Sequence, residues 1–385
     1  MADNKDKKVL KVPDLRFPEF TDEWERKKFR DVCNITTGNK NTQDKSNDGI
    51  YPFYVRSQIV ERINSWTFDG EAILTAGDGV GVGKVFHYST GKIGVHQRVY
   101  ILSDFKCDGK YLYSYFAGHF YNRVKRMSAK NSVDSVRMEM IADMPISLPS
   151  TEEQKKIGHL LALLDERIAT QTKIIEDLKK LKSAIIENVL NSGHCVNLRL
   201  GDVGAYIRGL TYNSNDVIDY NGTLVMRSNN IINGSQLDYN NNVVSVNKQI
   251  SQEQQLQDGD IVICMANGSS ALVGKSSFYD GKCLSPITVG AFCGIYRSKM
   301  PITKWLFQTN RYRRYIWNSL QGGNGAIANL NGEDILRMLF PLPDKQTTDR
   351  CTKLLSSLDS LIESNVSLCL KYSQQKEYLL RQMFI

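Results

Sequence analysis

Two short segments of the chain combine an arginine with side-chain amides beside a predicted strand. One is Arg56-Ser57-Gln58, which follows Tyr54, and the other is Arg227-Ser228-Asn229-Asn230. Arginine can form two hydrogen bonds with guanine, and asparagine or glutamine can do the same with adenine. These residue types therefore suit the reading of base edges in DNA. An arginine–carboxylate pair next to an amide turn would explain either copy alone, whereas the repetition favours a shared role.

Two further kinds of loop could contact DNA. The segment Val95-His96-Gln97-Arg98 is polar and bounded by predicted strands, so it is a candidate reading loop; a surface histidine without a ligand fits it equally well. Lys84 and Lys275 follow glycine-rich segments that fail the P-loop spacing. The first has Asp78 where glycine is required and Val85 where serine or threonine is required, and the second is one residue too long. We interpret both segments as tight hairpin turns, whose amides and lysines could touch a phosphate.

Basic residues are concentrated in two places. The 385 residues include 49 Lys and Arg against 41 Asp and Glu, a formal charge of +8, which fits a polyanionic partner without establishing one. Residues 109–133 and 304–332 contain no acidic residue. The predicted phosphate contacts in these segments are Lys125, Arg126, Arg311, Arg313 and Arg314.

The sequence offers no catalytic or metal-binding constellation. Pro13-Asp14 with Glu25-Arg26-Lys27 mimics a nuclease string, but it lies in a charged N-terminal arm without a strand hairpin to aim it. The eight cysteines form no CxxC pair and the five histidines have no ligand spacing. We therefore predict no catalytic residue, no metal and no cofactor on this chain. A polar N-terminus and the lack of a long apolar stretch predict a cytoplasmic protein without a membrane partner.

The chain repeats itself once. Residues 160–168 match residues 354–362 at an offset of 194 without a gap, and earlier segments match at offsets of 171, 189 and 191. Insertions in loops change the offset between matched segments in this way, because loops tolerate changes of length and packed elements do not. The repeat predicts two mixed α/β domains related by pseudo-twofold symmetry.

Each half ends in a long heptad pattern that predicts a helix. The two helices share a polar amide and a lysine at matching steps, which indicates an antiparallel coiled coil; separate packing of each helix on its own domain is the alternative. The predicted seam includes Leu161, Leu164, Ile168, Gln171, Ile175, Leu178, Leu355, Leu358, Ile362, Asn365, Tyr372 and Leu379. The fold class is thus α+β, with an N-terminal arm (1–16), domains at 17–150 and 193–343, and spacer helices at 151–192 and 344–385.

The order domain, long helix, domain, long helix resembles the specificity subunit of type I restriction–modification systems. Residues that carry the resemblance are 12–20 with Trp24, the Arg-Ser-Gln/Asn pairs, residues 146–157, and the helical segment 163–168. The resemblance implies two target-recognition domains, each reading half of a bipartite double-stranded DNA target, and paired helices that set the unread spacer. Two methylase subunits with S-adenosylmethionine would dock on the chain, and restriction subunits with ATP would join them.

Two other classes of protein are weighed against this non-catalytic DNA-specificity subunit. A self-contained nuclease or methyltransferase would require catalytic motifs, which the sequence lacks. A coiled-coil scaffold that binds only proteins, without base reading, would keep the helices but need no DNA-contacting loops.

Overall fold

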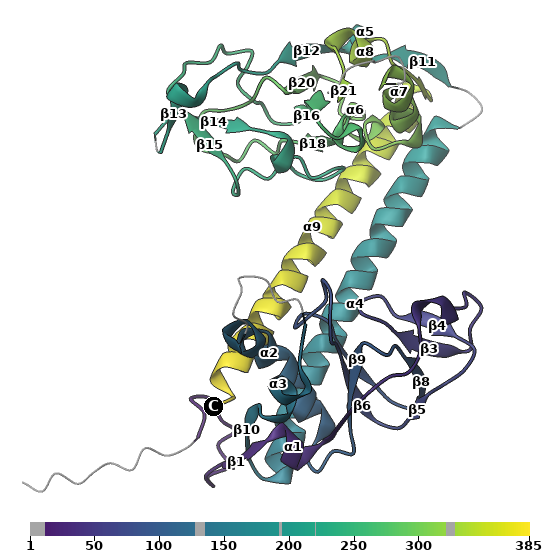
Figure 1. Ribbon diagram of the computed structural model, residues 1–385. Helices are drawn as coiled ribbons and strands as arrows, with labels where there is room; N and C mark the ends of the chain where they lie inside the picture. Colours follow the sequence, from purple (N-terminus) through teal and green to yellow (C-terminus); the bar gives the residue numbers. More distant parts are fainter. Residues whose placement is uncertain (1–11, 128–134, 192–194, 220, 321–327) are drawn as a thin grey trace, which may run out of the picture. The chain divides into compact units, whose positions relative to one another are not determined.

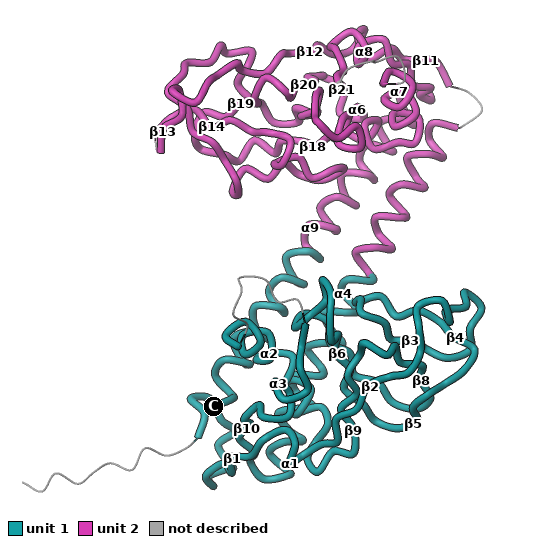
Figure 2. The backbone as a smooth tube through the Cα atoms, in the orientation of Figure 1, with its two compact units in different colours: residues 1–173, 365–385 teal, residues 174–364 magenta. Residues whose placement is uncertain are grey.

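The computed structural model describes residues 12–127, 135–191, 195–219, 221–320 and 328–385. The chain divides into two compact units, which Figure 2 colours separately. Unit 1 contains residues 1–173 and 365–385, and unit 2 contains residues 174–364. The long helices α4 (Thr151–Leu190) and α9 (Lys345–Gln382) therefore each contribute residues to both units.

Unit 1 is built on two four-stranded sheets, ordered β2-β9-β6-β7 and β4-β3-β8-β5, together with the strand pair β1-β10 (Figure 1). Strands β3 and β8 run parallel, whereas the other paired strands are antiparallel. The strands are β1 (Glu25–Lys28), β2 (Asn34–Thr37), β3 (Tyr51–Tyr54), β4 (Glu61–Ile63), β5 (Phe68–Asp69), β6 (Ala72–Ala76), β7 (Phe86–Ser89), β8 (Lys92–Val95), β9 (Val99–Ser103) and β10 (Pro145–Leu148). The helices are α1 (Phe29–Val32), the short η1 (Thr42–Asp44), α2 (Gly109–Met127) and α3 (Met138–Ala142).

Unit 2 repeats the strand order of the first sheet and three strands of the second, β4-β3-β8, which correspond to β15-β14-β19. Its sheets are ordered β12-β20-β16-β18 and β13-β15-β14-β19, and the parallel pair recurs as β14 with β19. Its strands are β11 (Val196–Arg199), β12 (Gly204–Arg208), β13 (Val217–Ile218), β14 (Thr223–Met226), β15 (Val244–Val246), β16 (Ile261–Cys264), β17 (Ala266–Asn267), β18 (Ser276–Phe278), β19 (Ile287–Val289), β20 (Cys293–Ser298), β21 (Ala328–Asn329) and β22 (Leu339–Leu342). Its helices are α5 (Leu200–Val203), η2 (Ser214–Asp216), η3 (Ser228–Asn230), η4 (Ser270–Leu272), α6 (Thr303–Leu306), α7 (Asn310–Leu320) and α8 (Gly332–Leu336).

Short apolar runs form the central strands. All five residues of β6 and all four of β16 are buried, which is what an apolar run covered on both faces requires. Residues 303–320 form two helices, α6 and α7, rather than one. The break lies at Thr309, whose hydroxyl accepts a hydrogen bond from the Tyr312 N–H (3.0 Å) and so caps the start of α7.

The two long helices pair in opposite directions within each unit. In unit 1 the first half of α4 lies beside the second half of α9; Lys376 binds Asp165 there, and the Gln171 amide donates to Asn365 near the middle of both helices. In unit 2 the end of α4 lies beside the start of α9, where Lys182 Nζ is 2.9 Å from Asp359 Oδ1. Every predicted seam side chain is buried or half-buried. The predicted fold class, two mixed α/β units with an antiparallel coiled coil, is confirmed.

The described part of the N-terminal arm is fixed to α4 by an ion pair. The Arg16 guanidinium binds both carboxylate oxygens of Glu153 at 2.7 Å, and the Glu153 side chain is fully buried. Paired in this way, a buried carboxylate can stay charged. Within the described residues, no helix is long and apolar enough to cross a membrane.

Candidate nucleic-acid interface

Two arginines of unit 1 converge on one carboxylate. Asp78, just after β6, lies 2.8 Å from Arg56 Nη1 and 3.7 Å from Arg98 Nε. The arginine side chains are 45% and 65% exposed, so their remaining N–H groups face solvent. Guanidinium groups held in place by a carboxylate lose less freedom when they bind a planar acceptor such as a guanine edge.

His96 supports this cluster from below the surface. Its ring is buried; Nδ1 accepts a hydrogen bond from the Arg98 N–H (3.0 Å), and Nε2 lies 3.3 Å from the Thr42 hydroxyl. Burial, and next the charge of Arg56, lower the pKa of His96 below its ordinary value. With both ring nitrogens in contact with protein groups, His96 shapes the loop between β8 and β9.

The other predicted residues of this loop region divide into exposed and internal groups. The Tyr54 ring is buried and its hydroxyl donates to Ser89 Oγ (3.1 Å), while the Ser57 hydroxyl bonds the Ile59 carbonyl (3.0 Å). Gln97 Nε2 donates to Asn41 Oδ1 (2.6 Å), and Gln58 is exposed. Gln58 lies two positions after Arg56, and Gln97 directly precedes Arg98, so these are the unit 1 amides nearest in sequence to the two arginines.

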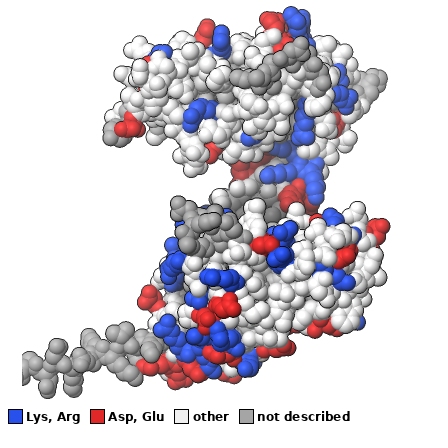
Figure 3. Space-filling model, viewed as in Figure 1, with Lys and Arg blue, Asp and Glu red and all other residues white. Residues whose placement is uncertain are grey.

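Basic side chains also lie on the β6–β7 turn and on α2. Lys84 is exposed after a turn in which Gly79 and Gly83 have positive φ, and its ammonium lies 5.5 Å from the centre of the Tyr121 ring. Lys125 and Arg126 are exposed in the last turn of α2. Over the face that Figure 3 shows, basic and acidic side chains alternate on both units, so any phosphate contact depends on local clusters such as these.

In unit 2 the second Arg-amide segment forms a turn after β14. Asn230 is fully buried; its Oδ1 accepts from the Arg227 N–H (2.8 Å), and its Nδ2 donates to the carbonyls of Asp238 (3.0 Å) and Asn241 (2.7 Å). Asn230 therefore holds the loop, while the exposed Arg227 guanidinium lies 3.5 Å from the Asn242 carbonyl. Asn229 is exposed beside it.

The two Arg-amide segments are one residue out of register in the fold. Tyr54 and Met226 are equivalent, because their carbonyls accept from His96 N–H (3.0 Å) and Gly290 N–H (2.8 Å) after the matched strands. Arg56 is the second residue after Tyr54, whereas Arg227 is the first after Met226. The sequence offset of 171 therefore pairs two arginines that the fold places one position apart.

A pocket of about 480 Å³ lies next to Arg227, and of the residues that line it only Arg227 and Ser228 were predicted from the sequence. We call it the unit 2 pocket. Its walls include Tyr212, Arg227, Ser228, Asn267 and Phe292. Asn267 and Phe292 have no counterpart of the same type in the first half, so the repeat could not single them out. The combination of aromatic, amide and guanidinium groups suits a nucleobase edge.

Residues on α7 and the β16–β18 turn complete the predicted set in unit 2. Arg313 and Arg314 are exposed on α7, and Arg311 Nε donates to the Leu339 carbonyl (2.8 Å). Lys275 is half-buried at the turn. The positions on α7 are open to a phosphate backbone, as Lys125 and Arg126 are on α2.

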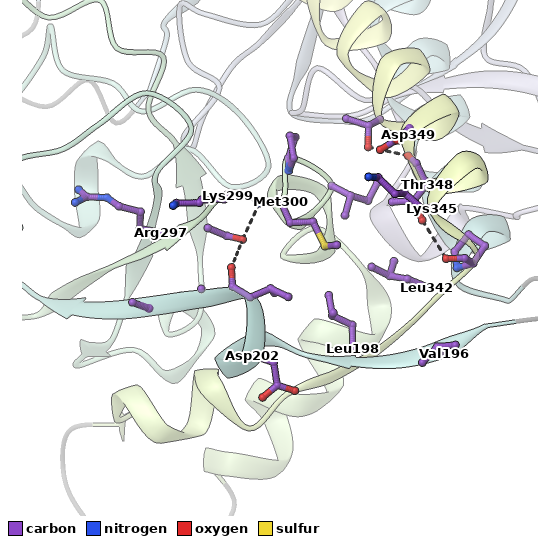
Figure 4. Close-up of a pocket in the computed structure, with 18 of the residues that line it drawn as sticks. Val196, Leu198, Asp202, Arg297, Lys299, Met300, Leu342, Lys345, Thr348 and Asp349 are labelled. Atoms are coloured by element: carbon purple, nitrogen blue, oxygen red, sulfur yellow. Dashed lines mark hydrogen bonds between the residues drawn. The ribbon is translucent and has the colours of Figure 1, made fainter.

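A second pocket of unit 2, about 1000 Å³, lies between β11, β22 and the first turns of α9 (Figure 4). Leu198, Met300 and Leu342 give it apolar walls. Its buried carboxylate, Asp260, binds the Arg297 guanidinium at 2.7 and 2.8 Å. The described chain contains no cluster of His, Cys, Asp and Glu that could hold a metal.

Comparison with known proteins gives a family-model match to less than half of the chain. Residues 21–180 match the family model described as the type I restriction modification DNA specificity domain. The specificity subunit of the type I restriction enzyme EcoDI from Escherichia coli is 28% identical over 173 residues, which are 44% of this chain and 38% of that subunit. The EcoKI specificity subunit from Escherichia coli strain K12 is 29% identical over 171 residues, 41% of this chain and 35% of that subunit. Each alignment thus covers well under half of the relative.

A solved structure extends the likeness in fold to almost the whole chain. The S subunit of a type I restriction–modification system from M. genitalium has a TM-score of 0.67 and covers 97% of this chain and 99% of its own. The two sequences are only 14% identical. At that identity the likeness concerns the fold alone.

Proposed function

Since residues 21–180 belong to the DNA-specificity domain family of type I restriction–modification systems, we propose that the whole chain is a specificity subunit without an active site of its own. Its domains, at 17–150 and 193–343, each bind one half of a bipartite target in double-stranded DNA. The spacer helices, at 151–192 and 344–385, set the unread gap. A protein with this role works where the chromosome is, in the cytoplasm.

One observation carries the proposal. The same arrangement of a four-stranded sheet beside a parallel strand pair occurs twice, and in each copy the loops that follow the parallel pair present exposed arginine and amide side chains. Two equivalent scaffolds with different loop side chains are what a bipartite target with unlike halves requires. Arg56, Gln97 and Arg98 would contact bases in one half, and Arg227 and Asn229 in the other. Lys84, Lys125, Arg126, Lys275, Arg311, Arg313 and Arg314 would contact phosphates.

The helices support the partners that this role needs. On α9, Leu354, Leu361 and Leu368 recur every seven residues and are 48%, 47% and 39% exposed, outside the coiled-coil seam. An exposed apolar stripe at heptad spacing suits packing against further helices. We assign it to a methylase subunit and the matching face of α4 to a second one. S-adenosylmethionine belongs to these subunits, and ATP to restriction subunits that join them.

The test is to purify the chain with its methylase partner and to sequence the DNA it selects. We expect a shift of duplex DNA at low salt and one bipartite motif, with two fixed blocks separated by a gap of constant length. Selected DNA without any common motif would contradict the proposal. Failure to shift DNA even at low salt would favour a scaffold that binds only proteins.

A further inference from the structure

The turn between β6 and β7 presents one side chain at its tip, that of Val80. Gly79 has a φ of +78°, where a residue with a Cβ would be strained. A Cβ at Gly81 would lie 2.5 Å from the Arg56 carbonyl oxygen, which leaves no room for a side chain. Glycine is thus required on both sides of Val80, whose own side chain is 99% exposed.

Hydrogen bonds and a buried side chain hold this tip in place. The Val82 N–H donates to the Gly79 carbonyl (3.1 Å), and the Val85 N–H donates to the Gly81 carbonyl (2.9 Å). The Val82 side chain is buried in the core of unit 1. A valine side chain is stiff at χ1, so Val80 loses little conformational freedom when another molecule covers it.

Val80 lies beside the two arginines that we propose as base contacts. Asp78, two positions earlier in the turn, binds Arg56 at 2.8 Å and lies 3.7 Å from Arg98 Nε. A Cβ at Gly79, the residue next to Val80, would lie 3.8 Å from Arg56 Nη1. Guanidinium groups that bind base edges in the major groove therefore bring Val80 to the same groove.

The major groove offers one apolar group to such a side chain. Thymine carries a methyl group there, at C5, whereas the other base edges present hydrogen-bond donors and acceptors. An aliphatic side chain gains free energy by covering a methyl group, but it leaves a polar edge without a hydrogen-bond partner. The chemistry of Val80 therefore favours thymine over the other three bases.

The equivalent turn of unit 2 has a different tip. There η4 (Ser270–Leu272) takes the place of residues 79–81, because the first carbonyl of each segment accepts from the N–H of the following valine, Val82 (3.1 Å) or Val273 (3.2 Å). Unit 2 thus has serine and leucine where unit 1 has its two glycines. A tip reduced to a single valine side chain belongs to unit 1.

We propose that Val80 contacts the 5-methyl group of a thymine in the half-site read by unit 1, beside the bases that Arg56 and Arg98 contact. This inference rests on the proposed function and goes beyond it, because it names the chemical group on the DNA and the side chain that recognises it.

The experiment removes the methyl group from the DNA without changing the base pairing. Uracil pairs with adenine as thymine does but lacks the 5-methyl group. The complex of this chain with its methylase partner first selects its motif, and each thymine of both half-sites is then replaced singly by uracil. At one thymine of one half-site, uracil should weaken binding of the wild-type complex about fourfold, the loss expected for one methyl group that is no longer buried.

Val80→Ser connects that loss to the valine side chain. The variant changes an exposed position, so it should fold like the wild type, and thermal unfolding checks this. It should bind the thymine and uracil duplexes equally at that position, and the effects of uracil in the other half-site should not change. The matched control is Val196→Ser, at a valine of β11 that is 79% exposed, which should keep the fourfold difference.

Three results would overturn the inference while leaving the proposed function standing. They are a bipartite motif in which no uracil substitution weakens binding, a uracil effect that is the same in Val80→Ser as in the wild type, and loss of the difference in Val196→Ser as well. A wild-type complex that selects no bipartite motif would instead remove the proposed function itself.

Discussion

The side-chain amide of Gln171 on α4 donates a hydrogen bond to Asn365 on α9, and the two residues are 194 positions apart, which is the offset of the sequence repeat. The ion pairs on either side follow the same rule. Lys182 binds Asp359, and Lys376 binds Asp165. Lys376 lies 194 positions after Lys182, and Asp359 lies 194 positions after Asp165. Polar residues that pair across a coiled-coil seam fix the register of the two helices.

Replacing this amide pair by leucine should stabilise the helices. Gln171→Leu alone removes one hydrogen-bond partner of the half-buried Asn365 amide. This variant should have a free energy of unfolding lower by about 1 kcal/mol. Gln171→Leu with Asn365→Leu should recover that loss or exceed it, because apolar seam residues pack without desolvating polar groups. Thermal unfolding of both variants checks this, with Thr170→Leu at an exposed neighbouring position as control. A double variant no more stable than Gln171→Leu would refute it.

The Asp359 carboxylate should make the chain sensitive to acid. Burial raises its pKa, but the charges and hydrogen bonds of Lys182 and Lys304 outweigh burial, so the pKa lies below its ordinary value of 3.8. A lowered pKa in the folded state stabilises the protein above about pH 4, and this contribution is lost as the pH falls further.

Asp359→Asn tests this directly. The substitution leaves two lysines close together without their carboxylate, and at neutral pH it should cost about 3–5 kcal/mol. The unfolding free energy of the variant should also depend less on pH below about 4 than that of the wild type. Urea unfolding at several pH values measures both effects. Glu363 is exposed on the same helix, and the control variant Glu363→Gln should change neither the free energy of unfolding at neutral pH nor its dependence on pH.

Arg56 and Arg227 should act on different halves of the DNA target. Under the proposed function, Arg56→Ala should relax base selection in one half and Arg227→Ala in the other, each costing about 1–3 kcal/mol of discrimination. Sequencing of selected DNA for each variant measures this. Equal loss of binding on all sequences would instead show that both arginines contact phosphate.

Lys125 and Arg313 should contribute to binding without regard to sequence. Each lies exposed on a helix that flanks its unit's loops, so Lys125→Ala and Arg313→Ala should weaken binding to all duplexes. Each should also reduce the slope of log K against log salt by about 1. Titration of specific and unrelated duplexes over a range of salt concentrations checks both effects. A change in the selected motif would contradict the phosphate assignment.

Features set by local sequence were predictable, and those set by contacts between distant residues were not. The heptad positions alone indicated the buried seam, and the apolar runs indicated β6 and β16. In contrast, His96 and Asn230 share their residue types with exposed reading residues, and only the packing around them shows that they support loops. The bond between Arg56 and Asp78 joins residues 22 positions apart whose pairing no spacing rule predicts.

The unit 2 pocket shows the same limit for the candidate site. Between the ends of β6 and β16 and the turns at Gly83 and Gly274, the second half has extra residues, so the sequence alignment drifts near Asn267. Phe292 stands where the first half has an arginine, so a search for repeated polar residues passes over it. A comparison of the two halves finds residues that they share, so it does not find residues that differ between them.

The crossed pairing of Lys182 with Asp359 and of Lys376 with Asp165 makes each long helix self-complementary. A fragment that ended after α4 would carry its own Asp165, Gln171 and Lys182, and two copies placed antiparallel could form two Lys182–Asp165 ion pairs and one contact between their Gln171 amides. The residues that pair the two helices of one chain could then pair α4 with a second copy of itself, and under the proposed function such a dimer would read two identical half-sites.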